Sequence, residues 1–421
     1  MIEITPKSKI NAVVSINGSK SVTHRALITS ALAEGQSVLE EFLSCEDTLY
    51  TLEALRKMGV DISIDENKVI VNGTGGDFPS NDGMREIFLG NAGTSYRLLL
   101  SIAALAKGEY VLTGIPRMLE RPIGDLVAAL KTLGVKAECV GKEGYPPVSV
   151  KAEGIKGGSV KIQGNISSQY LSSLLLAAPY AQNDVEIEVI GELVSRPYID
   201  VTLDVMQAFG INIENNNYGE FKIASQNKYR SRRFIVDGDV SSASYFWGAA
   251  AITGGTAVTN NIHPFTTRQG DIALLDIMEK MGCHVIKEDN SVTVKGGTLK
   301  GVDVDMGALP DMVPTMAAVA LFAEGQTTIR NVAHLRYKES DRIGDTVTEW
   351  QKLGGHIEET EDGLIIQGGY DLKGAEMDPH DDHRLAMSLA MVGLKVPGVR
   401  IRNENCVDKS FPSFWKFWDL L

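Results

Sequence analysis

The sequence predicts a two-domain α/β (α+β) protein built from six repeats of about 70 residues, three in each domain. Three observations predict this fold class. Small residues followed by an apolar, Ala- or Leu-rich run recur six times, from Gly18, Gly90, Gly164, Gly238, Pro310 and Pro379. An apolar residue followed by glycine recurs with the same spacing. The chain has 421 residues, which is too long for one hydrophobic core.

Each repeat is expected to begin with a helix after a turn of Gly, Ser, Asn or Asp, as in "GNAGTSYRLLL" from Gly90. A strand and a second helix follow. The second helix ends in an apolar residue plus glycine, and glycine there is the left-handed cap after the last helical turn. These pairs are Met58-Gly59, Leu133-Gly134, Phe209-Gly210, Met281-Gly282 and Leu353-Gly354.

Two short strands close each repeat. The segments 60–73, "VDISIDENKVIVNG", and 283–297, "CHVIKEDNSVTVKGG", alternate and turn like hairpins. The sixth repeat stops at "FPSFWKFWDLL", whereas the N-terminal "MIEITPKSKINAVVSI" has strand-like residues and no helix before them. We therefore expect the N-terminus to complete the sixth repeat. One domain is then discontinuous, residues 1–17 with 236–421, and the second spans residues 18–235.

Composition and charge exclude several classes of function. The net charge of −13 argues against nucleic acid and anionic membranes as partners. No apolar run reaches the roughly 18 residues of a membrane span, and the N-terminus does not have the order of a signal peptide. We expect a cytoplasmic protein. Its four cysteines show no CxxC spacing, so neither a zinc site nor a disulfide framework is predicted.

Cations lie where the first helices begin: Lys20 and Arg25 in the first repeat, Arg97 in the second and Arg384 in the sixth. A cation in a first helical turn opposes the helix dipole unless a bound anion compensates it. Further cations flank the second helices, namely Arg117, Arg121, Arg196, Arg268, Arg336, Lys338, Arg342 and Lys409. Taken one at a time, each of these cations could be an ordinary surface charge. Together they predict an electropositive cleft for a small phosphorylated and carboxylated substrate.

Nucleotide and metal motifs do not explain these cations. "GSKS" from Gly18 lacks the glycine that a Walker A loop has before its lysine. No strand-linked GxGxxG and no HExxH occur. "HDDHR", residues 380–384, fits anion binding better than metal binding because an arginine follows the acidic residues.

A few residues among these cations can transfer protons: Asp311, Glu339, Asp341, Asp382 and His383. A carboxylate at a helix start is usually only a cap. Glu339, however, stands between Lys338 and Arg342, close to where anions would bind, and could serve as a general acid or base. No G-x-S-x-G elbow supports a hydrolase.

These segments resemble the 5-enolpyruvylshikimate-3-phosphate synthase family of enolpyruvyl transferases. The matching motifs run from residue 18 to residue 412: "GSKSVTHRAL", "LGNAGTSYRLL", "RMLERPIGDL", "NISSQYLSSLLLAAP", "SRPYIDVTL", "GDVSSASYF", "RYKESDRI", "DDHRLAM" and "DKSFP".

The resemblance implies two inside-out α/β barrel domains, each of three repeats, with the active site in the cleft between them. It implies transfer of the enolpyruvyl group of phosphoenolpyruvate to the 5-hydroxyl of shikimate 3-phosphate, by addition and elimination through a tetrahedral intermediate. This is a shikimate-pathway step in aromatic amino-acid biosynthesis, and it uses no cofactor and no metal. We expect a monomer.

The resemblance also implies roles for individual residues. Those expected to bind shikimate 3-phosphate are Lys20, Ser21, Arg25, Ser167, Ser168, Gln169, Ser195, Tyr198, Asp311 and Lys338. Those expected to bind phosphoenolpyruvate are Lys20, Gly93, Arg121, Gln169, Arg342, Arg384 and Lys409. The catalytic candidates are Lys20, Asp311, Glu339 and His383.

Two positions depart from the family pattern. Leu98 stands where members often have proline, and His334 where they often have asparagine. Gly93 is retained, so the small space beside phosphoenolpyruvate should remain open, and we expect glyphosate, a competitor for that space in the family, to inhibit.

Three alternatives remain open. A UDP-N-acetylglucosamine enolpyruvyl transferase would have the same fold, but a cysteine in the loop that reads "GIPRMLERPIGD" here. An RNA 3'-phosphate cyclase would have to bind a polymer, which the acidic balance disfavours. A non-catalytic anion-binding repeat protein would need no acid or base such as Lys20, Asp311 or Glu339.

Overall fold

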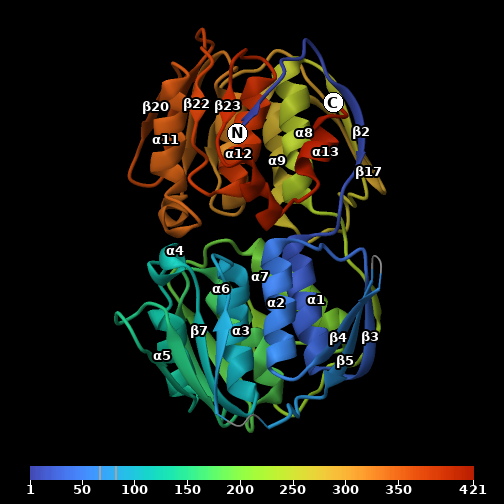
Figure 1. Cartoon of the computed structure of the whole chain (residues 1–421), viewed down its shortest axis with the longest axis vertical. Coiled ribbons are helices and arrows are strands. Elements are labelled where there is room, and N and C mark those ends of the chain that lie inside the picture. Colours follow the sequence, from blue (N-terminus) through green and yellow to red (C-terminus); the bar gives the residue numbers. More distant parts are fainter. Residues whose placement is uncertain (66–67, 81–82) are drawn as a thin grey trace. The chain divides into compact units, whose positions relative to one another are not determined.

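The computed structural model describes residues 1–65, 68–80 and 83–421. The chain divides into two compact units, Met1–Asn17 with Asp237–Leu421 and Gly18–Val236. We call them the split unit and the continuous unit. Both chain termini belong to the split unit (Figure 1).

The continuous unit contains the first three repeats. Its helices are α1 (Lys20–Leu32), α2 (Glu46–Lys57), α3 (Gly93–Leu105), α4 (Pro116–Leu119), α5 (Gly124–Thr132), α6 (Ser168–Ala177), η1 (Ala178–Tyr180) and α7 (Pro197–Ala208). Its strands are β3 (Glu34–Glu40), β4 (Asp61–Asp65), β5 (Lys68–Thr74), β6 (Met84–Phe88), β7 (Gly108–Thr113), β8 (Lys136–Cys139), β9 (Val148–Ala152), β10 (Gly158–Gln163), β11 (Val185–Ile190), β12 (Glu214–Asn216), β13 (Glu220–Ile223) and β14 (Arg233–Ile235).

The split unit contains the other three repeats. Its helices are α8 (Val240–Thr253), η2 (Gly270–Ala273), α9 (Leu274–Met281), η3 (Pro310–Met312), α10 (Val313–Ala320), η4 (Ala333–Tyr337), α11 (Arg342–Lys352), α12 (His383–Gly393), η5 (Glu404–Lys409) and α13 (Phe414–Trp418). Its strands are β1 (Ile2–Glu3), β2 (Asn11–Ser15), β15 (Thr256–Asn260), β16 (His284–Glu288), β17 (Ser291–Lys295), β18 (Asp303–Asp305), β19 (Gly325–Arg330), β20 (His356–Glu359), β21 (Leu364–Gly368), β22 (Glu376–Met377) and β23 (Arg400–Ile401).

Each of the first five repeats has a four-stranded sheet of one pattern. In the second repeat the strand order is β6-β7-β9-β8, with β6 parallel to β7 and the other pairs antiparallel. The predicted order of helix, strand, helix and two strands is therefore confirmed. The prediction omitted the strand before each first helix, such as β6 or β10, which makes a βαβ crossover with the strand that follows the helix.

The first strands of the first and fourth repeats are exchanged along the chain. β2 directly precedes α1 but pairs in parallel with β15, whereas β14 directly precedes α8 but pairs in parallel with β3. The expectation that the whole N-terminus completes the sixth repeat is therefore wrong for β2. It is confirmed for β1, which pairs antiparallel with β23.

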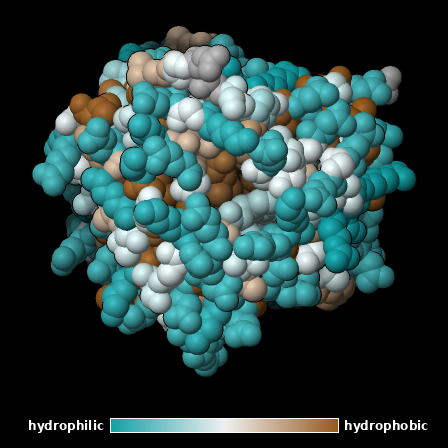
Figure 2. Space-filling model, turned by 90° about the horizontal axis from the view of Figure 1, so that it is seen from below, coloured by the Kyte–Doolittle hydropathy of each residue, from teal (hydrophilic) through white to brown (hydrophobic). Residues whose placement is uncertain are grey.

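Both units are built with helices inside and sheets outside, which confirms the inside-out α/β class. The first helices α1, α3 and α6 pack on one another, as do α8, α10 and α12. Every residue of α1 from Val22 to Leu32 is buried, whereas β2 and β10 bury alternate residues. The outer faces of the sheets can therefore be polar, and hydrophilic side chains predominate on the face in Figure 2. No helix of the described residues is long and apolar enough to cross a membrane.

The five predicted glycine caps are confirmed. Gly59, Gly134, Gly210, Gly282 and Gly354 have φ between 84° and 109°. The hairpins are also confirmed: β16 pairs with β17, and β4 pairs with β5. The turn of the second pair, residues 66 and 67, lies outside the described residues.

Candidate functional site

The three predicted arginines of the first helices are buried, and Lys20 is partly exposed. Arg25 is 1% exposed, Arg97 6% and Arg384 5%, and the side chain of Lys20 is 12% exposed. A buried charge is costly unless partners compensate it. The partners of each cation therefore indicate what the site can hold.

Arg25, on α1, is surrounded by neutral oxygens. Its Nε donates to Thr202 Oγ1 at 2.7 Å, and its Nη atoms donate to the carbonyls of Ser21 and Tyr198 at 2.9 and 3.1 Å and to Ser172 Oγ at 3.3 Å. In the described part of the chain no carboxylate lies within 4 Å of this guanidinium. Burial lowers the pKa of Arg25 to about 10, so it stays cationic at neutral pH. The arrangement leaves one positive charge for a bound anion.

The predicted serines lie on two neighbouring segments. Ser167 caps α6, where its Oγ accepts a hydrogen bond from the Gln169 N–H at 3.3 Å, and Ser168 is the first residue of that helix. The segment before α7 reaches them through the Val194 N–H, which donates to the Gly164 carbonyl at 3.0 Å. Ser195 follows with φ of 55°. Hydroxyls beside a helix N-terminus suit a phosphate.

Two guanidinium groups converge on Gly93, the first residue of α3. A Cβ added at Gly93 would lie 2.6 Å from Arg97 Nη1 and 2.6 Å from Arg121 Nη2. Arg121 Nη1 donates to the Asn91 carbonyl at 3.0 Å, and Arg97 Nη1 donates to Gln169 Oε1 at 3.1 Å. A side chain here would displace at least one of the two guanidinium groups, and two cations share one helix N-terminus.

Lys20 has a buried acidic partner that the sequence analysis did not include. Lys20 Nζ lies 2.9 Å from Asp47 Oδ2, and Asp47 is 1% exposed. Asp47 stands in the first turn of α2, where an acidic residue by itself predicts only a favourable interaction with the helix dipole. Thr202 and Ser172, which both accept hydrogen bonds from Arg25, were not predicted as site residues either, because a single hydroxyl residue gives no sequence signal.

The split unit gathers its charged residues around Asp311. Arg384 Nη2 donates to Asp311 Oδ2 at 2.7 Å, Arg342 Nη1 donates to Oδ1 at 2.9 Å, and Lys338 Nζ lies 3.8 Å from Oδ1. Burial by itself would raise the pKa of Asp311, but Arg384, Lys338 and Arg342 hold that pKa well below its ordinary value. Asp311 is therefore ionised and accepts hydrogen bonds.

Arg342 is the centre of this cluster. Its side chain also binds Glu339 Oε2 at 2.8 Å and both oxygens of Asp382, at 2.7 Å to Oδ2 and 3.2 Å to Oδ1. Burial would lower the pKa of Arg342, but Asp382, Glu339 and Asp311 outweigh it and raise that pKa. The predicted residues Asp311, Lys338, Glu339, Arg342 and Arg384 therefore do form one network.

The remaining candidates lie at its border. His383 is buried, and its Nδ1 lies 3.7 Å from Asp382 Oδ1. Lys409 is buried at the end of η5, which packs against α12. Burial, with Lys338 as a further cause, lowers the pKa of His334 to about 4, so this ring is neutral at pH 7.

Some predicted cations belong to the surface instead. Arg117 pairs with Glu120, and Arg336 pairs with Asp341 and Glu359, all of them partly exposed. Arg196 lies over the ring of Tyr218, 5.8 Å from its centroid. Such exposed contacts contribute little to stability.

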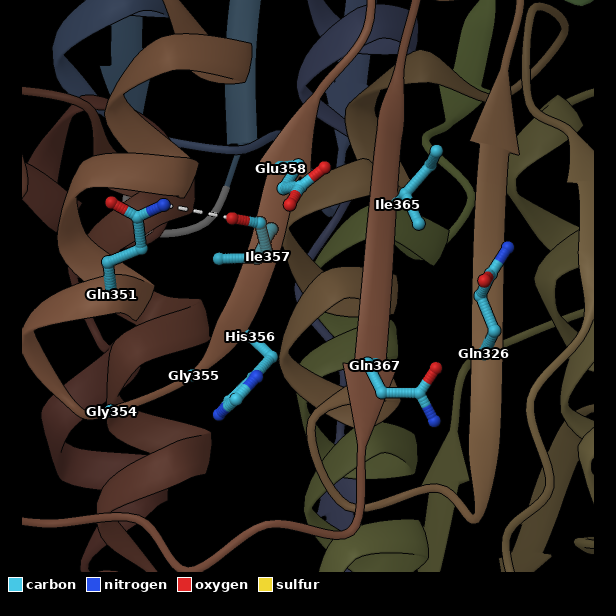
Figure 3. A pocket seen from close by; sticks show the side chains of 9 residues that line it. All are labelled: Gln326, Gln351, Gly354, Gly355, His356, Ile357, Glu358, Ile365 and Gln367. Atoms are coloured by element: carbon cyan, nitrogen blue, oxygen red, sulfur yellow. Dashed lines mark hydrogen bonds between the residues drawn. The ribbon is translucent and has the colours of Figure 1, made fainter.

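Over the described ranges, no group of three or more His, Cys, Asp and Glu residues could hold a metal ion. An open pocket of about 570 Å³ lies elsewhere, on β19, β20 and β21 beside the end of α11, where Gln351 donates to the Ile357 carbonyl (Figure 3). None of its lining residues is a predicted site residue.

The chain is similar to proteins of one family over nearly its whole length. The family model "EPSP synthase (3-phosphoshikimate 1-carboxyvinyltransferase)" matches residues 4–418. A 3-phosphoshikimate 1-carboxyvinyltransferase of Sulfurovum sp. (strain NBC37-1) is 45% identical over 418 residues, which cover 99% of this chain and 97% of that protein. One from Methanoculleus marisnigri is 45% identical over 417 residues, covering 99% of this chain and 98% of that protein.

Solved structures show the same fold. An EPSP synthase structure from Acinetobacter baumannii superposes with a TM-score of 0.82 at 30% sequence identity, covering 99% of this chain and 97% of that chain.

Proposed function

The chain belongs to the EPSP synthase family, and on this premise we propose that its two clusters of buried cations bind the two anionic substrates of one reaction. The chain is a transferase of the shikimate pathway. It transfers the enolpyruvyl group of phosphoenolpyruvate to the 5-hydroxyl of shikimate 3-phosphate and releases phosphate. The family assignment does not favour the UDP-N-acetylglucosamine enolpyruvyl transferase, RNA cyclase or non-catalytic alternatives.

Shikimate 3-phosphate carries a carboxylate and a phosphate, and the continuous unit has a candidate group for each. Arg25, with Ser21, would bind the carboxylate. Ser167, Ser168 and Ser195 would bind the phosphate. The observation that carries the proposal is the buried Arg25, whose partners are neutral oxygens and whose charge a substrate carboxylate would compensate. Further contacts to the ring and its hydroxyls would come from Lys20, Gln169, Tyr198, Asp311 and Lys338.

Phosphoenolpyruvate would take the remaining cations. Arginine suits a carboxylate or phosphate because its planar fork donates two parallel hydrogen bonds. Arg121, beside Gly93, has its guanidinium at the N-terminus of α3. Arg384 and Arg342 meet at Asp311. The full set that we propose is Lys20, Gly93, Arg121, Gln169, Arg342, Arg384 and Lys409.

The candidates for proton transfer are titratable residues of the two units. The 5-hydroxyl oxygen adds to C2 of phosphoenolpyruvate and gives up its proton, while C3 gains a proton. When phosphate leaves the tetrahedral intermediate, C3 loses a proton again and the enolpyruvyl ether forms. Asp311 is ionised, so it would accept the hydrogen bond of the 5-hydroxyl and orient it. Lys20 and Glu339 are candidates for delivering the proton to C3. His383 is a further catalytic candidate, and its ring lies beside the Asp382 carboxylate.

We also propose that the protein works as a monomer in the cytoplasm. The test of the proposed function is release of inorganic phosphate. It should require both substrates and yield the enolpyruvyl ether in equal amount. Two outcomes would contradict the proposal. One is phosphate release from phosphoenolpyruvate without shikimate 3-phosphate, and the other is no phosphate release when both substrates are present.

A further inference from the structure

Helix α11 holds the segment 378–384 at two points. Arg342 and Glu349 are seven residues apart, which is about two helical turns, so they lie on the same face about 10 Å apart along the axis. Both are buried, at 1% and 0% exposure. Arg342 binds Asp382 at the far end of the segment, and Glu349 binds its beginning.

Glu349 makes the contacts of a carboxylate that is built into the fold. Its Oε2 accepts a hydrogen bond from the Asp378 N–H at 2.9 Å, and its Oε1 lies 2.9 Å from Nε2 of His380. Lys352 Nζ, at 2.7 and 2.8 Å from the two oxygens, supplies the opposite charge from the surface. A fully buried carboxylate with three partners is held strongly in place, and removing its charge disturbs them all.

The segment that Glu349 binds has an unfavourable backbone. His380 and Asp381 both have left-handed conformations, with φ of 52° and 55°. Residues other than glycine adopt this conformation at a cost, and it persists where the surroundings impose it. Asp378 Oδ1 accepts from the His380 N–H at 2.8 Å, and the Asp382 N–H donates to the Pro379 carbonyl at 2.8 Å. The bonds to Glu349 join this turn to α11.

The turn ends at the residues that face the substrates. Asp382 is fully buried, caps α12 by accepting from the Arg384 N–H at 2.9 Å, and binds Arg342. Arg342 and Arg384 then converge on Asp311. A change in the turn therefore moves both guanidinium groups.

We propose that Glu349, with His380, is a positioning residue that fixes the turn 378–382 and so sets the direction in which Arg342 and Arg384 present their N–H groups to phosphoenolpyruvate. The proposal rests on the assignment of these two arginines in the proposed function. It assigns Glu349 no contact with either substrate.

The experiment is steady-state kinetics of Glu349→Gln with each substrate varied in turn, well below the unfolding temperature. Glutamine keeps the shape of the side chain but cannot keep its charge or all its acceptor bonds. We expect the KM for phosphoenolpyruvate to rise about tenfold or more, as small misplacements of binding groups do. The KM for shikimate 3-phosphate should stay within about twofold, because its charged ends bind the continuous unit. The matched control is Glu358→Gln, an exposed residue of β20, which should change neither.

A pair of variants at His380 keeps the proposal falsifiable if Glu349→Gln does not fold. The side chain of His380 is 34% exposed, and Ala and Gln meet the same left-handed backbone cost there. His380→Ala removes the partner of Glu349 and should raise the KM for phosphoenolpyruvate. His380→Gln keeps a donor and should raise it less.

Two results overturn the inference. One is a folded Glu349→Gln, or a His380→Ala, whose melting temperature falls while its KM for phosphoenolpyruvate does not change. The other is an equal rise in both KM values. Arg384→Gln separates this failure from that of the proposed function. If Arg384→Gln leaves the KM for phosphoenolpyruvate unchanged, the assignment of the arginines is wrong; if it raises that KM and Glu349→Gln does not, only the positioning role is wrong.

Discussion

Gly93 determines how closely two arginines approach the N-terminus of α3. A methyl group there would lie 2.6 Å from the guanidinium groups of both Arg97 and Arg121, so at least one must move. We expect Gly93→Ala to raise the KM for phosphoenolpyruvate about tenfold or more, and to change the KM for shikimate 3-phosphate less. Initial rates of phosphate release measure both.

The control for Gly93→Ala is Gly219→Ala in the same unit. The nearest atom to a Cβ at Gly219 is the Asn216 carbonyl oxygen at 3.6 Å, which is an ordinary contact. An unchanged KM for phosphoenolpyruvate in Gly93→Ala would show that Arg121, beside Gly93, does not bind that substrate.

Asp271 is the buried carboxylate whose environment contrasts most with that of Asp311. It is 4% exposed, its Oδ2 accepts from the Ser241 hydroxyl, and its Oδ1 has no hydrogen-bond partner among the described residues. Burial first, and the charge of Asp311 second, raise the pKa of Asp271 to about 7. Paired carboxylates whose pKa values are pushed apart in this way differ in charge at neutral pH.

The raised pKa of Asp271 predicts a pH dependence of stability. Between about pH 4 and pH 7 the folded chain keeps a proton on Asp271 that the unfolded chain has lost, so the free energy of unfolding falls as the pH rises. Above about pH 7 this loss is complete. Asp271→Asn should remove this fall in the free energy of unfolding. Urea unfolding from pH 4 to pH 8 measures the difference between variant and wild type.

Asp276→Asn is the control, because Asp276 is exposed on α9 and pairs with Lys287 at the surface. Parallel stability curves for Asp271→Asn and wild type over this pH range would mean that Asp271 titrates at its ordinary pKa.

At the scale of elements, glycine fixes the join between a first helix and the strand after it. Gly18 precedes α1, and a Cβ there would lie 1.8 Å from the carbonyl oxygen of Glu41, directly after β3. Gly238 precedes α8, and a Cβ there would lie 1.9 Å from the carbonyl oxygen of Asn261, directly after β15. Glu41 and Asn261 both have left-handed backbones, with φ of 55° and 63°. The same close contact therefore recurs in the first and fourth repeats.

Gly18→Ala should destabilise the protein by about 2–4 kcal/mol, because backbone and not a flexible side chain occupies the space. Urea unfolding of the variant, with Gly219→Ala as reference, measures this. A loss no larger than that of the reference would mean that the join can relax.

The sequence predicted the helices and glycine caps of these elements because their signals are local. It did not predict short strands such as β18, with three residues, or the partners of β2 and β14. The partners of these two strands lie 245 and 195 positions away in the sequence, and periodicity within a window carries no information about them. The same reason applies to the site. The cations were predicted from their recurring positions in the repeats, whereas Asp47, Thr202 and Ser172 reach Lys20 and Arg25 only through tertiary contacts.

At the scale of the whole molecule, each unit has one cluster of buried arginines. The continuous unit has Arg25, Arg97 and Arg121, and the split unit has Arg342 and Arg384. Burying arginines is unfavourable for folding unless partners repay it. In the split unit Asp311 and Asp382 offset this cost, whereas in the continuous unit Arg25 has neutral oxygen partners, and its uncompensated charge is the physical reason for assigning an anionic substrate to that cluster.

The most direct test is the KM for phosphoenolpyruvate of two variants, Arg121→Gln in the continuous unit and Arg384→Gln in the split unit, at saturating shikimate 3-phosphate. The account predicts that each raises this KM about tenfold or more, since each removes a charge-assisted hydrogen bond to the same ligand. An unchanged KM in either variant, with the protein folded, would contradict the claim that both clusters bind this substrate.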